Sequence, residues 1–187
     1  MKFANLWRRI EAFLLDYIFI VAYIFLLIIV SVGLELGPLK SVFRLMFADP
    51  NRSDISAFLL LVLPVILYFS LFESSSWQAT WGKRKRRLHV VDTQGDRLSF
   101  PRSFIRSLLK FVPWELTHAC LWRIPGWPLT PSTPSPVISA GLVLVWILVG
   151  VYLVSILVSR KHQAIYDWIT GTYVIVVESE IRKLNEK

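Results

Sequence analysis

Three long apolar stretches constrain this chain more than any other feature of its sequence. They cover residues 10–33, 55–72 and 137–158, and the last two contain no charged residue. The first stretch carries only Glu11 and Asp16, both near its start. A bilayer core about 30 Å thick is crossed by a helix of about 20 mostly apolar residues. Each stretch therefore predicts a transmembrane helix. The first stretch is also too long for the core of a signal peptide and lacks a convincing cleavage site, so we expect an uncleaved helix.

The composition agrees with a membrane protein and argues against an ordinary soluble domain. Charged residues make up 18% of the chain and mean hydropathy is +0.54, whereas soluble domains contain about 25% charged residues. The net charge of +8 in so apolar a chain indicates a bilayer with anionic headgroups as partner, and no nucleic acid. Cys120 is the single cysteine, which excludes an intramolecular disulfide and a four-cysteine zinc site.

A fourth crossing over residues 103–124 resolves the topology. With four spans and both termini in the cytoplasm, 17 basic residues lie inside and four outside, as the positive-inside rule requires. The outer four are Lys40, Arg44, Arg52 and Arg123. In the alternative, 103–124 begins as an interfacial helix with Arg102, Arg106 and Lys110 on its polar face, and Pro113 ends it.

The predicted fold class is therefore an all-α membrane protein of about four transmembrane helices with a small cytoplasmic β region. We expect one domain over residues 1–177 and a charged cytoplasmic tail over 178–187. The loop over residues 73–102 is cytoplasmic in this topology. The loops over residues 34–54 and 125–136 are external, the second being too rich in proline for a helix. Within the cytoplasmic parts, Leu88–Val91 and Arg97–Phe100 predict a hairpin around Gly95, and Thr172–Val177 predicts a further strand.

Asp16 is the main candidate for ion chemistry, because a carboxylate two turns inside a span is costly unless it is paired or protonated. Arg9 shares its helix face, but seven residues is too far for direct contact. Its partner is then a cation such as Arg106 or Lys110, or a proton that keeps it neutral. With a cation as its partner, Asp16 forms a salt bridge that fixes the packing of the helices. With a proton, Asp16 is an ion- or proton-binding group.

The basic run formed by Lys83, Arg84, Lys85, Arg86 and Arg87 lies about ten residues beyond a predicted span. At that position each cation gains about 1 kcal/mol beside anionic headgroups. We therefore expect the run to contact lipid and to set topology.

Glu115 and His118 are three residues apart, and together they predict either a proton relay or an interfacial pair. His118 and Cys120 form too poor a set for a metal site. The sequence contains no nucleophile–base–acid set and no dinucleotide or zinc-protease motif, so we expect no enzyme chemistry and no cofactor or metal. Near the C-terminus, Tyr166–Thr172 is apolar enough to dock on the membrane or on residues 88–100, with Asp167 accepting bonds from Arg102 or Arg106.

Three motifs, in order, resemble the RDD family of membrane proteins. They run from Trp7 to Asp16, from Trp77 to Gly95, and from Arg160 to Thr172. The resemblance maps the family's Arg and first Asp to Arg9 and Asp16, and its second Asp to Asp167 or Asp92. The basic stretch Lys85–Arg87 and the segment 115–136 depart from the family pattern.

The resemblance implies a multi-pass protein of a bacterial-type inner membrane, in a family often described as transporters, with some members linked to sodium–proton antiport. Two functions stay open. One is transport of a small cation or proton through Asp16, which four helices support best as a homo-oligomer. The other is a non-transporting scaffold or interaction protein in which Arg9, Asp16 and Asp167 are structural.

Overall fold

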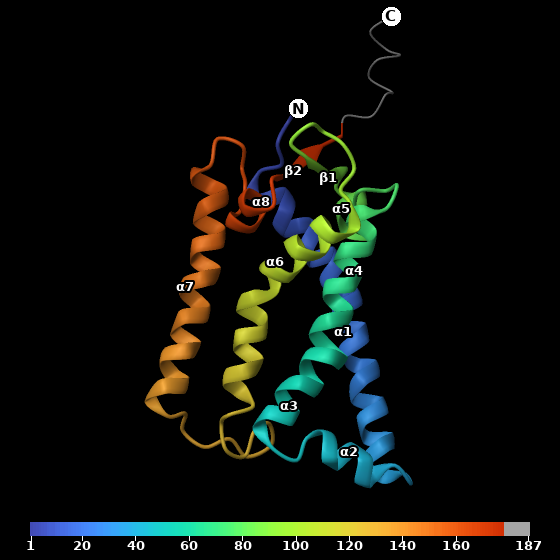
Figure 1. Cartoon of the computed structure of the whole chain (residues 1–187), viewed down its shortest axis with the longest axis vertical. Coiled ribbons are helices and arrows are strands. Elements are labelled where there is room, and N and C mark those ends of the chain that lie inside the picture. The colour runs from blue at the N-terminus through green and yellow to red at the C-terminus, as the bar shows by residue number, and fades with distance from the viewer. Residues whose placement is uncertain (178–187) are drawn as a thin grey trace, which may run out of the picture. The chain divides into compact units, whose positions relative to one another are not determined.

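The computed structural model describes residues 1–177, and the tail predicted for 178–187 lies outside them. The chain is mostly helical with one two-stranded sheet (Figure 1). In order, its elements are α1 (Leu6–Leu36), α2 (Lys40–Met46), α3 (Pro50–Ala57), the π-helical turn η1 (Phe58–Val62), α4 (Leu63–Ser74), α5 (Trp81–Lys85), β1 (Leu88–Asp92), α6 (Phe100–Leu121), α7 (Pro136–Val158), α8 (Ile165–Ile169) and β2 (Thr172–Val176).

Three helices in the described part of the chain are long and apolar enough to cross a membrane. They are α1, the continuous helix Pro50–Ser74, and α7. These are the three apolar stretches of the sequence, so the prediction of three membrane-spanning helices there is confirmed in length and composition. Most large apolar side chains of α1 and α7 are exposed, as expected of helices that face lipid.

Helix α6 corresponds to the predicted fourth stretch and has 22 residues, with Pro113 inside it. The alternative in which Pro113 ends this helix is therefore wrong. Beyond the proline, Thr117 Oγ1 donates a hydrogen bond to the Pro113 carbonyl at 2.8 Å. At about 1.5 Å per residue, α6 is about 33 Å long.

The second membrane helix passes through Pro64 by widening the turn before it. Proline lacks the N–H that would bond the carbonyl of Leu60, four residues earlier. The preceding residues form η1, and the Leu60 carbonyl accepts a bond from the Tyr23 hydroxyl at 2.5 Å. A π-helical turn and a neighbouring hydroxyl are the usual means by which membrane helices satisfy carbonyls freed by proline.

The chain divides into two compact units. Unit 1 comprises Met1–Tyr17, Tyr68–Ser107 and the stretch that begins at Tyr152. Unit 2 comprises Ile18–Leu67 and Leu108–Val151. Unit 1 contains both strands, α5 and α8.

In unit 1 the sheet joins three distant parts of the sequence. Strands β1 and β2 are antiparallel, with Leu88 opposite Val176 and Asp92 opposite Thr172. The N-terminal residues lie along β2, since Ala4 N–H donates to the Val174 carbonyl at 2.8 Å. Figure 1 shows the N-terminal segment beside the two strands. A small apolar core lies here, formed by Ala4, Ala12, Leu88, Val90, Leu98 and Val174.

The predicted hairpin is wrong in its second strand. After β1, the Asp92 side chain accepts bonds from the N–H groups of Gln94 and Asp96 at 2.9 Å, which forms a tight turn. The returning chain makes one isolated bridge, between Val91 and Arg97, before α6 begins. The strand predicted at Thr172–Val177 is the partner of β1 instead, because its β-branched and aromatic residues bury more apolar surface.

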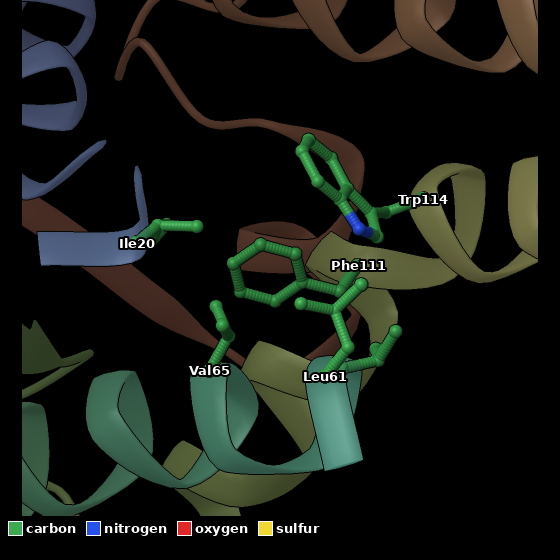
Figure 2. A pocket seen from close by; sticks show the side chains of 6 residues that line it. Ile20, Leu61, Val65, Phe111 and Trp114 are labelled. Carbon is green, nitrogen blue, oxygen red and sulfur yellow. The ribbon is translucent and has the colours of Figure 1, made fainter. Parts of the chain in front are cut away.

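In unit 2, apolar side chains from three helices enclose a small hollow. Figure 2 shows Phe111 between Ile20, Val65 and Leu61, with Trp114 beside it. This lining provides packing contacts rather than ligands for an ion.

The external loop predicted for residues 34–54 is partly helical, since it contains α2 and the start of α3.

Candidate functional site

Five charged side chains of unit 1 form a chain of ion pairs with alternating sign. Arg9 Nη1 lies 2.5 Å from Asp167 Oδ2, and Asp167 Oδ1 lies 2.6 Å from Arg106 Nη2. Arg106 Nη1 also lies 2.5 Å from Glu73 Oε2, and the other Glu73 oxygen pairs with Lys83 Nζ. We call these five residues the ion-pair chain. It connects α1, α4, α5, α6 and α8.

All five members of the ion-pair chain are buried. Asp167 and Glu73 are 0% exposed, Arg106 is 1% exposed, and Arg9 and Lys83 are below 10%. A buried charge is tolerated only when it is paired and its remaining polar atoms are hydrogen-bonded. Arg9 meets the second condition through the carbonyls of Ala4 and His162. In total, the ion-pair chain contains three cations and two anions.

Asp16 does not belong to this chain. Its Oδ1 accepts bonds from the Tyr68 hydroxyl at 2.9 Å and from Gly82 N–H at 2.7 Å, and its Oδ2 accepts from Thr80 Oγ1 at 2.5 Å. Asp16 is 0% exposed, and none of the described residues forms an ion pair with it. The expectation that Arg106 faces Asp16 is wrong, because Arg106 is taken by Asp167 and Glu73.

Gly82 lets α5 begin directly against α1. A Cβ at this position would lie 2.1 Å from the Ala12 carbonyl oxygen and 2.9 Å from the Asp16 carboxylate. Only glycine allows so close an approach of two backbones. Gly82 also donates its N–H to Asp16, so the Thr80-Trp81-Gly82 sequence and Asp16 form one local arrangement.

The basic run divides between the interior and the surface. Lys83 points inward to Glu73, so, contrary to the expectation for the whole run, it is not available to a lipid headgroup. Arg84 lies over the Trp77 ring at 4.1 Å and Lys85 over the Trp81 ring at 5.4 Å. The two arginines that follow are also exposed, and Arg86 pairs with Glu11.

Lys110 and Asp92 are not members of the ion-pair chain. Lys110 belongs to unit 2 and lies over the Phe111 ring at 5.0 Å, and it is not a partner of Asp16. Asp92, the alternative second Asp of the family motif, closes the turn after β1 and lies 3.6 Å from Arg102. Of the two partners predicted for Asp167, Arg106 is the observed one, at 2.8 Å from Nε to Oδ1, and Arg102 is not.

Glu73 is the member of the ion-pair chain that sequence reasoning missed. It is the first charged residue after the apolar stretch 55–72, and the sequence alone places it in the cytoplasmic loop over residues 73–102. The available signal was a single acidic residue at the end of an apolar helix, in a protein with two arginines that need partners. Tyr68 and Thr80, the hydroxyl partners of Asp16, gave no signal in the sequence.

Asp167 is held ionised by its neighbours. Burial alone raises the pKa of this carboxyl, but the charges of Arg106 and Arg9 and their hydrogen bonds lower it to about 2. Asp167 also accepts a bond from Ala164 N–H at 3.2 Å, which caps α8. Burial raises the pKa of the adjacent Tyr166 to about 12, so its hydroxyl stays neutral.

This lowered pKa predicts an acid-dependent loss of stability. Because the pKa of Asp167 falls from 3.8 to about 2 on folding, its charge stabilises the fold above about pH 4, and this contribution disappears as the pH drops through 2. The shift corresponds to about 2 kcal/mol. We expect thermal unfolding in detergent to show this acid step in the wild type, and Asp167→Asn to be less stable at neutral pH without the step. The exposed Asp96→Asn is the control, and a wild-type acid step retained in Asp167→Asn contradicts the assignment.

The apolar helices and the small sheet define a helical membrane protein with a buried charge network. The family model that matches this chain is that of the RDD family, over residues 3–171. The chain belongs to the RDD family, as the three motifs indicated. No curated protein and no solved structure matches it.

Proposed function

We propose that this protein is a transporter coupled to a proton or small cation, with Asp16 as the group that exchanges the proton. One observation carries the proposal. Asp16 is a fully buried carboxylate inside the first membrane helix that is hydrogen-bonded to neutral groups and has no ion-pair partner among the described residues. Intramembrane carboxylates of this kind are the usual proton carriers of pumps and transporters.

The partners of Asp16 suit both of its protonation states. Hydroxyl groups donate or accept hydrogen bonds according to need. When Asp16 is ionised, Thr80 and Tyr68 donate to it. When Asp16 is protonated on Oδ2, it donates to Thr80 Oγ1, while Gly82 N–H still binds Oδ1. Asp167 and Glu73 differ, because each of them forms ion pairs with buried cations.

The proposal has a direct test in the Asp16→Asn variant. Asparagine keeps the shape, its oxygen accepts from Tyr68 and Gly82, and its NH₂ donates to Thr80. We therefore expect the variant to unfold within about 1 kcal/mol of the wild type but to lose pH-linked flux in proteoliposomes that contain only this protein. Glu11→Gln, which removes an exposed carboxylate, should keep the flux. Undiminished flux in a stable Asp16→Asn protein rules out Asp16 as the proton carrier.

We also propose four membrane crossings with both termini and residues 83–102 in the cytoplasm of a bacterial-type inner membrane. The 22-residue length of α6 and the 17 to four division of basic residues support this. In a variant in which Cys120 is replaced by Ser, we expect an impermeant thiol reagent to label a cysteine at Ser132 from outside, and not one at Thr93 or Thr170. Labelling of Thr170→Cys from outside contradicts the four-span topology.

Anionic lipid and other copies of this chain are the partners that we propose. Arg84, Lys85 and Arg87 are exposed, and cations at this level are attracted to anionic headgroups. On α8, Trp168 is 75% exposed and Ile169 is 62% exposed, and such residues anchor at the membrane interface. A homo-oligomer would supply the pathway that so few helices lack.

A second candidate function follows from the ion-pair chain. It links five elements to one another through buried charges. Such links suit a protein that acts as a rigid scaffold. In that role the face around α5 and α8 binds a partner and nothing crosses the membrane. Wild-type proteoliposomes without any pH-linked flux would favour this function.

A further inference from the structure

A second group of titratable side chains belongs to unit 2 and shares no residue with the ion-pair chain. Five buried side-chain polar atoms in the described part of the chain have no hydrogen-bond partner. Four of them belong to this group: Asp54 Oδ1, Glu115 Oε2, His118 Nδ1 and Trp122 Nε1. Such atoms are rare in proteins, and a concentration of them indicates an additional bound species such as water or a proton.

The sequence and one ion pair bring these four side chains together. Glu115, His118 and Trp122 are spaced three and four residues apart, which places them on one side of the end of α6. Arg123 follows them and donates to Asp54 Oδ2 at 3.2 Å and to the Ala119 carbonyl at 2.6 Å. Asp54 of α3 is thereby held against the same stretch.

The charges within the group are unequally compensated. Asp54 has Arg123 as its counter-ion. Glu115 has no ion pair and no side-chain hydrogen bond among the described residues, although one of its oxygens is buried. An ionised Glu115 would thus be an unpaired, partly buried charge near a second carboxylate, which is unfavourable. A protonated Glu115 is neutral and supplies an O–H donor.

The unpartnered atoms also match a shared proton in their hydrogen-bonding character. Asp54 Oδ1 accepts, Trp122 Nε1 donates, and His118 Nδ1 does either according to its tautomer. A protonated Glu115 adds a donor, so the group contains both the donors and the acceptors that bridging water molecules need. The charge of Asp54 acts on both Glu115 and His118. His118 follows Glu115 by one helical turn in α6, and Arg123 pairs with Asp54.

We propose that Glu115 binds a proton at neutral pH and shares it, through water, with His118 and Asp54. This proton site does not involve Asp16 and does not depend on whether the protein transports anything. His118 orients the proton on Glu115, and Asp54 favours its retention through its negative charge.

Infrared titration of the purified protein in lipid nanodiscs tests the proposal. The stretching band of a protonated carboxyl is expected at neutral pH, and it should weaken in Glu115→Gln. Asp16→Asn separates any contribution of Asp16, and the exposed Glu11→Gln is the control. Asp54→Asn should move the titration of the Glu115 band to lower pH, because it removes a like charge. Arg123→Gln should move it to higher pH, because it leaves Asp54 uncompensated.

A second measurement uses the unaltered protein. A hydrophobic carbodiimide reacts with protonated carboxyls, so mass spectrometry should locate the adduct on Glu115 at neutral pH, and the yield should fall as the pH rises. An infrared band unchanged in Glu115→Gln, or a Glu115 that reacts only under acidic conditions, overturns the proposal.

Discussion

Replacing Arg106 with Gln is expected to destabilise the protein by about 3–5 kcal/mol, the cost of removing one partner from a buried ion network. Arg106 lies between Asp167 and Glu73 and is 1% exposed. The substitution leaves two buried carboxylates that lose their shared cation, although Arg9 and Lys83 remain. Thermal unfolding in detergent and the yield of folded protein measure the effect.

Arg102→Gln is the matched control, one helical turn earlier in α6. The Arg102 side chain is 47% exposed and lies 3.6 Å from Asp92, and exposed pairs contribute about 0–1 kcal/mol. Equal stability of the two variants would mean that the ion-pair chain does not stabilise unit 1. A conservative Arg106→Lys change should recover only part of the loss, because lysine cannot bond both carboxylates in the fork geometry of arginine.

Gly82→Ala is the second change with a large expected effect. The new Cβ would lie 2.1 Å from the Ala12 carbonyl oxygen, well inside van der Waals contact, so α5 must move away from α1. That movement stretches the bond from Gly82 N–H to Asp16. Overpacking of this kind costs about 1–3 kcal/mol or more, and we expect about 3 kcal/mol because backbone rather than a flexible side chain is in the way. The thermal unfolding temperature provides the measurement.

Gly150→Ala provides the comparison for the glycine change. A Cβ at Gly150 meets no atom within 4 Å, and alanine is the better helix former by about 0.5–1 kcal/mol. This variant should equal or exceed the wild type in stability. If Gly82→Ala behaved in the same way, the close approach of α5 to α1 would not matter for the fold.

The membrane helices could be predicted because the bilayer imposes a length and a composition on each one separately. Residues 55–72 and 137–158 contain no charge, and no other part of the chain needs to be known to read them as spans. The Arg106–Asp167 bond was predictable in part, since a docked Asp167 needs a cation and the sequence offered Arg102 or Arg106. The family motifs gave Arg9 and Asp16 by resemblance.

The partners of Asp16 and the pairing of β1 were not predictable in this way. Helical periodicity tells which face Asp16 occupies but not which distant segment covers that face. Thr80 and Gly82 lie 64 and 66 residues further along the chain. A turn after β1 also favoured a local hairpin, whereas the observed strand partner comes from the C-terminal part of the sequence. Which distant segments pair depends on the apolar surface that the whole fold buries, and local sequence patterns do not show this.

The ion-pair chain has a consequence for biosynthesis. Asp167 lies 158 residues after Arg9 and 61 residues after Arg106, and β2, which binds the N-terminal residues, follows it. Because a ribosome delivers the chain from the N-terminus, all three apolar stretches and both arginines leave it before the carboxylate that the arginines share exists. Unit 1 can therefore close only after translation has passed residue 176, and a nascent chain stopped after α7 holds Arg9 without its ion-pair partner and Arg106 without one of its two.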